Sequence, residues 1–147
     1  MIDPVNPAES AAPTPYHQLG GAPTVWRIVE AFYRRVETDD ILRPLYPEDL
    51  EPGRQKLAWF FEQWLGGPTS YSDRYGHPRL RRRHFPFVID ERAAGRWLRL
   101  MREAWTEAGV PRELQDPIFE RLAVLARHMI NAHDDVPREP LGDVYLD

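Results

Sequence analysis

No cysteine occurs among the 147 residues of the chain, and this absence excludes several classes of protein at once. Disulfide-stabilised folds, zinc sites built on thiolates, iron–sulfur clusters and thiol nucleophiles all require cysteine. Any metal must therefore be held by histidine, by carboxylates or through a cofactor.

Long apolar runs are also missing. No stretch approaches the roughly 20 apolar residues that a membrane-spanning helix needs. Residues 1–15 contain neither the basic nor the apolar stretch of a secretory signal. We therefore expect a cytoplasmic protein with no stable membrane insertion. A chain of this length, with 42% hydrophobic and 29% charged residues, fits one globular domain.

The two ends of the chain differ from its middle. Six of the fifteen prolines lie in residues 1–15 and 137–147, which are polar and show no periodicity. Such segments bury too little apolar surface to fold on their own. The sequence predicts flexible tails over residues 1–15 and 134–147 and one folded domain over residues 16–133.

Apolar residues recur with helical spacing in four segments, and no strand-like alternation is sustained. The stripes are Val25, Ile28, Val29, Phe32, Tyr33 and Val36; Leu57, Phe60, Phe61, Trp64 and Leu65; Ala94, Trp97, Leu98, Met101 and Trp105; and Ile118, Phe119, Leu122, Leu125, Ala126, Met129 and Ile130. The last two helices should form an antiparallel hairpin around Gly109, with the fourth beginning near Pro111. Short helices are expected at residues 39–44 and 78–84. The sequence thus predicts an all-α domain.

The segment from Gly66 to Phe87 is long, polar and poor in periodic apolar residues. Connections of this length in compact domains are usually functional or disordered. Because this one contains aromatic residues that favour burial, we expect it to serve a function.

The five histidines do not form a recognisable metal-binding motif. Only His77 and His84 lie near one another in the sequence, whereas a site built by the protein alone needs three or four ligands. A macrocycle that brings four nitrogens needs only one axial ligand from the protein. His84 is the candidate, because Leu80, His84 and Phe87 share one face of a short helix. The alternative is a hydrogen-bonded histidine of the core.

Arginines crowd into one short stretch, at positions 79, 81, 82 and 83. Guanidinium groups beside an iron ligand could pair with the two propionates of a porphyrin. The alternatives are a solvated surface or a weak nucleic-acid patch. The net charge of −4 and the lack of a further basic stripe argue against nucleic acid.

Three aromatic side chains on faces that should be buried carry hydrogen-bond donors. Tyr33 and Tyr46 bring hydroxyl groups, and Trp97 brings an indole N–H that can only donate. Donors around an apolar cavity would suit a bound ligand that gains partial negative charge.

The sequence resembles the group II truncated haemoglobins, the O-type bacterial members, over about residues 16–132. The segments that carry the resemblance are Gly20-Gly21, Ala31-Phe32-Tyr33, Leu45-Tyr46-Pro47-Glu48-Asp49, Gln63-Trp64-Leu65-Gly66-Gly67-Pro68, Tyr71-Ser72, Gly76-His77-Pro78-Arg79-Leu80-Arg81, Arg83-His84-Phe85-Pro86-Phe87 and Trp97-Leu98. The string from Gly76 to Phe87 is the most specific of them.

The resemblance implies a two-over-two helical sandwich around haem b, with His84 as the proximal iron ligand. On the opposite, distal side, Tyr33, Tyr46 and Trp97 would surround the bound ligand, and Leu57 would overhang it.

Further residues follow from the same resemblance. Gly53 falls where many globins carry a distal histidine, so the chain should lack that histidine and its entrance should stay open. Lys56, Tyr71 and Arg83 would lie at the propionates, and Phe87 would contact the cofactor.

We therefore expect a haem protein that binds dioxygen reversibly at a five-coordinate ferrous iron, with CO and NO as competing ligands. Retention of oxygen, more than its transport and delivery, is the expected behaviour. An enzymatic alternative is NO dioxygenase or peroxidase activity, which would need a partner reductase because no flavin or nicotinamide motif is present. A haem-free helical binding module is the remaining alternative. The sequence leaves the oligomeric state open, with a homodimer among the alternatives.

Overall fold

The computed structural model describes residues 13–79 and 89–131, and these residues form helices joined by turns and loops, with no strand among them. The helices are α2 (Pro15–Leu19), α3 (Ala22–Thr38), the 3-10 helix η1 (Arg43–Leu45), α4 (Glu51–Trp64), α5 (Ser70–Tyr75), α7 (Glu91–Glu107) and α8 (Arg112–Met129). None of these helices is long and apolar enough to cross a membrane.

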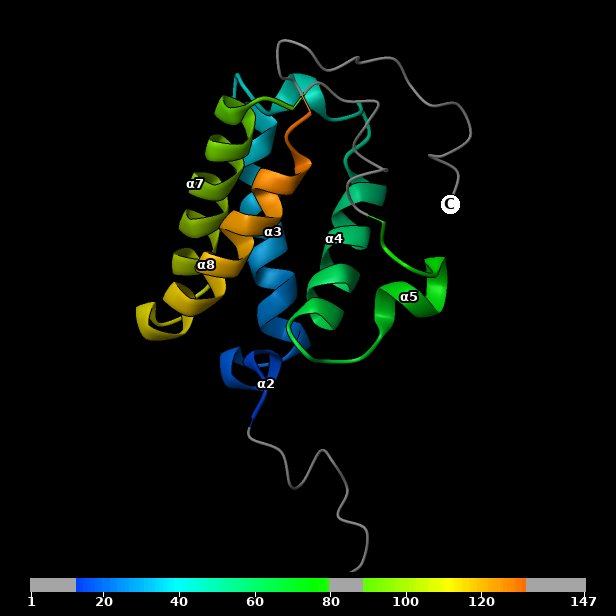
Figure 1. The fold of residues 1–147 in the computed structure, drawn as a ribbon, viewed down its shortest axis with the longest axis vertical. Helices are drawn as coiled ribbons and strands as arrows, with labels where there is room; N and C mark the ends of the chain where they lie inside the picture. Colours follow the sequence, from blue (N-terminus) through cyan, green and yellow to red (C-terminus); the bar gives the residue numbers. More distant parts are fainter. Residues whose placement is uncertain (1–12, 80–88, 132–147) are drawn as a thin grey trace, which may run out of the picture.

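The four long helices pack as two pairs. α3 packs on α4, α7 packs on α8, and the two pairs meet where α3 lies against α7. Figure 1 shows α3 between α7 and α4, with the short helix α5 on the far side of α4. This arrangement confirms the predicted all-α, two-over-two sandwich of a truncated globin.

The apolar stripes explain which face each long helix buries. In α3, Val25, Ile28, Val29, Phe32 and Val36 have no exposed surface, because their spacing places them on one side of a helix. The start of α7 is fixed by Asp90, whose carboxylate accepts a hydrogen bond from the amide of Ala93 at 2.8 Å. α8 follows Pro111 directly, as predicted.

The short helical elements differ from the sequence expectations where the structure describes them. The expected helix at 39–44 is a turn followed by the 3-10 helix Arg43–Leu45. The long connection after Gly66 contains the helix α5. Of the helix expected at 78–84, residues 78 and 79 are not helical, and the rest lies outside the described residues.

The folded part begins earlier than the predicted boundary at residue 16. Helix α2 starts at Pro15, and the side chain of Thr14 caps it by accepting a hydrogen bond from the amide of His17 at 3.4 Å. At the other end of the domain, the amide of Asn131 donates to the carbonyl of Ile89 at 2.9 Å. Residues 1–12, which belong to the predicted N-terminal tail, and residues 132–147, which include the C-terminal one, lie outside the described residues.

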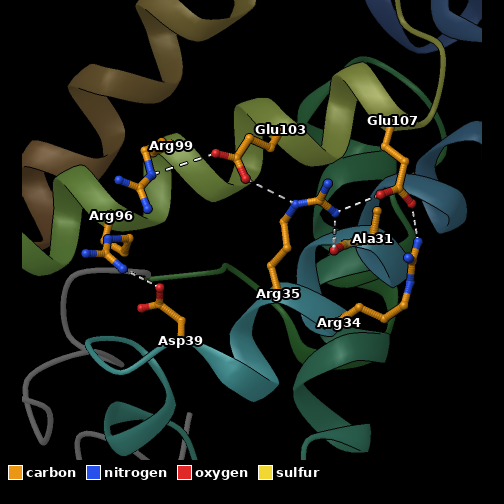
Figure 2. A network of polar contacts seen from close by, with 8 residues as sticks. All are labelled: Ala31, Arg34, Arg35, Asp39, Arg96, Arg99, Glu103 and Glu107. Carbon is orange, nitrogen blue, oxygen red and sulfur yellow. Dashed lines mark hydrogen bonds and ion pairs between the residues drawn. The ribbon is translucent and has the colours of Figure 1, made fainter.

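Ion pairs fasten α3 to α7. Arg35 on α3 contacts Glu103 at 3.3 Å and Glu107 at 3.0 Å, both on α7. Figure 2 shows this network, in which Arg34 also pairs with Glu107. Because these groups are partly exposed, each pair contributes only about 0–1 kcal/mol. Their effect is to hold the helix of Tyr33 against the helix of Trp97.

The most buried member of the network in Figure 2 that carries a charge is Asp39, at the end of α3. Its carboxylate accepts hydrogen bonds from the amides of Ile41 at 3.1 Å and Leu42 at 2.9 Å, and it pairs with Arg96 of α7. Burial alone would raise the pKa of Asp39, but these bonds, with the amide of Leu42 first, hold its pKa below the ordinary value of 3.8.

We predict that Asp39→Asn lowers the free energy of unfolding by about 1–3 kcal/mol at pH 7, because it leaves buried donors poorly satisfied. Since the folded-state pKa lies below 3.8, the carboxylate stabilises the fold fully above that pH and loses this effect as the pH falls further. The difference in the free energy of unfolding between the wild type and Asp39→Asn should therefore become smaller at acid pH. Urea unfolding at several pH values measures it, with Asp40→Asn as a control because the Asp40 side chain is 89% exposed. A difference in the free energy of unfolding that stays constant across pH would show that the Asp39 charge does not cause the stabilisation.

Candidate distal ligand site

The three predicted ligand-binding residues lie together, although they come from three different elements. Tyr33 lies on α3, Tyr46 directly follows η1, and Trp97 lies on α7. The rings of Tyr33 and Tyr46 meet edge to face, with their centroids 5.8 Å apart. Trp97 contributes a hydrogen bond to Tyr46, and because an indole N–H can only donate, the Tyr46 hydroxyl accepts.

Both tyrosines stay protonated in this environment. Burial is the main cause that raises the pKa of Tyr33 and of Tyr46 above 10.0, and the neighbouring Tyr33 adds to the rise at Tyr46. The bond from Trp97 opposes that rise only in part. The pair therefore offers two neutral O–H donors and no phenolate base.

Phe32 packs between Trp97 and Tyr33. It is fully buried, and its ring meets the indole of Trp97 edge to face at a centroid distance of 5.6 Å. Its ring also contacts that of Tyr33, at 5.5 Å. The sequence pattern indicated only a core position for Phe32, whereas the structure gives it a supporting position between two donors.

Gly53 lies in the first turn of α4, against the hydroxyl of Tyr33. A Cβ atom at this position would lie 2.9 Å from the Tyr33 Oη, closer than a side chain tolerates. Glycine is therefore needed here because the α4 backbone approaches the phenol so closely. The open entrance expected at Gly53 stays a prediction, and the Tyr33 hydroxyl lies against the position that a side chain there would fill.

Leu57 lies one turn after Gly53 on α4 and is partly buried against the main core. Lys56 is exposed, and its Nζ lies 5.4 Å from the ring centroid of Tyr75. The Tyr75 ring in turn contacts Tyr71 of α5 at 5.0 Å. The structure thus brings Lys56 and Tyr71 into one cluster through Tyr75, a link that their sequence separation did not indicate.

Tyr71 itself is buried. Only 4% of its surface is exposed, and its ring meets Phe60 edge to face at 6.2 Å. The remaining predicted cofactor contacts, His84, Arg83 and Phe87, lie outside the described residues.

Comparison with known proteins places the chain in a family. Residues 14–131 match the family described as bacterial-like globin. The group 2 truncated haemoglobin YjbI of Bacillus subtilis is 39% identical over 117 residues, which are 80% of this chain and 88% of that protein.

Two solved structures extend the likeness to the fold. The haemoglobin of Chloroflexus aurantiacus is 48% identical, with a TM-score of 0.78 over 82% of this chain and 99% of that chain. The truncated oxygen-avid haemoglobin of Bacillus subtilis is 39% identical, with a TM-score of 0.77 over 81% of this chain and 100% of that chain.

The helical sandwich is that of a globin. The chain belongs to the bacterial-like globin family and, within it, to the group II truncated haemoglobins. Haem is accordingly its cofactor.

The described residues fit that cofactor. Two phenol O–H groups and an indole N–H converge beside the apolar ring of Phe32. A donor set of this kind suits a small, polarisable ligand on one side of a haem. The exposed cation of Lys56, on the same helix as Gly53 and Leu57, suits a propionate at the haem edge.

We predict that Gly53→Ala destabilises the protein by about 1–3 kcal/mol, because the new methyl group collides with the Tyr33 hydroxyl. An exposed Gly→Ala change within a helix normally stabilises by up to about 1 kcal/mol. Gly95→Ala on α7 is the matched control, since a Cβ there has no atom within 4 Å. Urea unfolding of the haem-loaded proteins gives both values.

Tyr33→Phe should restore most of the stability that Gly53→Ala loses, because it removes the oxygen with which the methyl group collides. If the two changes are simply additive, the close approach of Gly53 to Tyr33 does not determine the effect.

Proposed function

We propose that this chain binds dioxygen reversibly at a five-coordinate ferrous haem iron, with His84 as the proximal ligand and with CO and NO as competing ligands. The observation that supports the proposal most directly is the convergence of Tyr33, Tyr46 and Trp97 from α3, the segment after η1, and α7. The similar Bacillus subtilis haemoglobin is described as oxygen-avid, which is in keeping with the proposal.

Haem supplies the iron that takes up the diatomic ligand, and the side chains of this chain set how strongly the ligand is held. Trp97 donates its N–H to the Tyr46 hydroxyl, which leaves the Tyr46 O–H free to donate to a ligand. A hydroxyl that accepts one hydrogen bond becomes a better donor in the next. The indole therefore strengthens the Tyr46 donor and also holds it in place.

These donors select between ligands by charge. Bound dioxygen gains partial negative charge and accepts hydrogen bonds, whereas CO carries little charge on its outer atom. A hydrogen bond to a charged or strongly polarised acceptor contributes about 1.5–3 kcal/mol. Because both tyrosines remain protonated, we propose slow release of oxygen and hence retention of the ligand.

The first prediction for this function concerns the proximal side. His84→Ala should weaken haem binding and abolish the native absorption spectrum, because the iron loses its protein ligand, and added imidazole should restore part of the spectrum. His77→Ala is the control, since His77 is exposed and its Nδ1 accepts a hydrogen bond from the amide of Arg79 at 3.1 Å. Absorption spectra of the ferrous and ferric proteins measure the effect. A native spectrum in His84→Ala would assign the ligand to another residue.

The second prediction concerns the distal side. Trp97→Phe keeps an aromatic ring but removes the donor, so oxygen should dissociate at least about tenfold faster. Tyr46→Phe should act in the same direction, and the double variant should be less than additive because the two residues share one hydrogen bond. Stopped-flow measurement of oxygen and CO dissociation tests this. Equal acceleration for both ligands would mean that cavity size, and not hydrogen bonding, controls release.

A further inference from the structure

Arg54 occupies an unusual position beside the distal site. It directly follows Gly53 in the first turn of α4, and its guanidinium pairs with Glu30 of α3 and, at 2.7 Å, with Glu51 of α4. Glu30 lies one helical turn before Tyr33 on α3. The ion pair between Arg54 and Glu30 therefore joins the two helices next to the contact of Gly53 with the Tyr33 hydroxyl.

The Arg54 side chain also has an unfavourable feature that an ion pair on the surface would not have. Its Nε is buried and has no hydrogen-bond partner in the described part of the chain, although 29% of the side chain as a whole is exposed. Leaving a buried donor unsatisfied is unfavourable, and a partly exposed ion pair contributes little in return. The pairing with Glu30 alone does not account for the burial of the Arg54 Nε without a partner.

The charge of Arg54 acts on Tyr33. Burial raises the pKa of Tyr33, and Arg54 is the group that opposes this rise. A nearby cation favours loss of the phenol proton, so it makes the O–H a stronger hydrogen-bond donor even though the proton stays in place.

We propose that Arg54 is a positioning residue of the distal site: held by Glu30, it keeps α4 against α3 beside Tyr33, and its positive charge strengthens the Tyr33 hydroxyl as a donor to the haem ligand. This inference rests on the proposed function, because it concerns the same site and names a residue that tunes ligand retention. An ion pair that only held α4 against α3, or a charge exposed to solvent, would have no effect on the ligand that depends on Tyr33.

Three variants separate charge from structure. Arg54→Met keeps the length of the side chain but removes its charge, whereas Arg54→Lys keeps the charge. Arg34→Met is the matched control, since Arg34 lies on α3 next to Tyr33 in the sequence but pairs with Glu107 of α7, away from α4. Each change is made in the wild-type chain and again with Tyr33→Phe.

Two readouts on the haem-loaded ferrous protein report the donor strength. The first is the rate of oxygen dissociation. The second is the C–O stretching frequency of the CO complex, which falls when positive potential near the ligand increases. Thermal unfolding of the haem-loaded protein provides a third measurement, which detects loss of stability.

We expect Arg54→Met to speed oxygen release by about three- to tenfold, or about 0.7–1.4 kcal/mol, and to raise the C–O frequency. Arg54→Lys should stay close to the wild type, and Arg34→Met should change neither readout. With Tyr33→Phe present, Arg54→Met should have little further effect, because the hydroxyl through which it acts is gone.

The proposal is overturned if Arg54→Met leaves both readouts unchanged, if it acts equally in the Tyr33→Phe chain, or if Arg54→Lys behaves like Arg54→Met. Altered thermal unfolding without a shift in C–O frequency would also overturn it, because the role would then be structural. If the wild-type protein does not hold dioxygen reversibly but Arg54→Met still shifts the C–O frequency through Tyr33, the proposed function fails and the role of Arg54 stands.

Discussion

The contact of Phe32 with Trp97 connects the two halves of the sandwich at the proposed ligand site. Phe32 has no exposed surface and packs edge to face on the indole, 5.6 Å between centroids. Edge-to-face pairs of this kind have a preferred geometry, so the contact sets the position of α3 relative to α7. Tyr33 is the next residue after Phe32, and a shift of Phe32 would therefore move the donor pair. The ion pairs of Arg35 reinforce this packing from the surface.

The site combines burial and polarity in a way that limits its chemistry. Tyr33 and Tyr46 are taken out of water, which disfavours their charged forms and keeps the O–H groups intact. The indole of Trp97 and the guanidinium of Arg54 oppose that effect without reversing it. The result is a set of neutral donors made stronger by their neighbours, which suits holding a polarised ligand more than removing a proton from a substrate.

Periodicity in the sequence predicted the four long helices, because each buries a continuous apolar face. It missed α5, since the six residues from Ser70 to Tyr75 are too few to show a period. The distal residues Tyr33, Tyr46 and Trp97 could be named from residue chemistry and resemblance, and the structure brings them together. Two features of the site could not be derived from the sequence. The role of Gly53 depends on how closely α4 approaches α3, which no local pattern encodes. Arg54 looks like any charged residue near a helix start, and only its contacts with Glu30 and its effect on Tyr33 distinguish it.

A crystal structure of the ferrous haem-loaded protein with dioxygen tests the central claim most directly. We predict that the Tyr46 hydroxyl lies within about 2.7–3.2 Å of the ligand, with the Trp97 N–H donating to that hydroxyl and His84 on the opposite face of the haem. A structure in which these side chains turn away from the ligand, or in which another residue ligates the iron, would contradict the account.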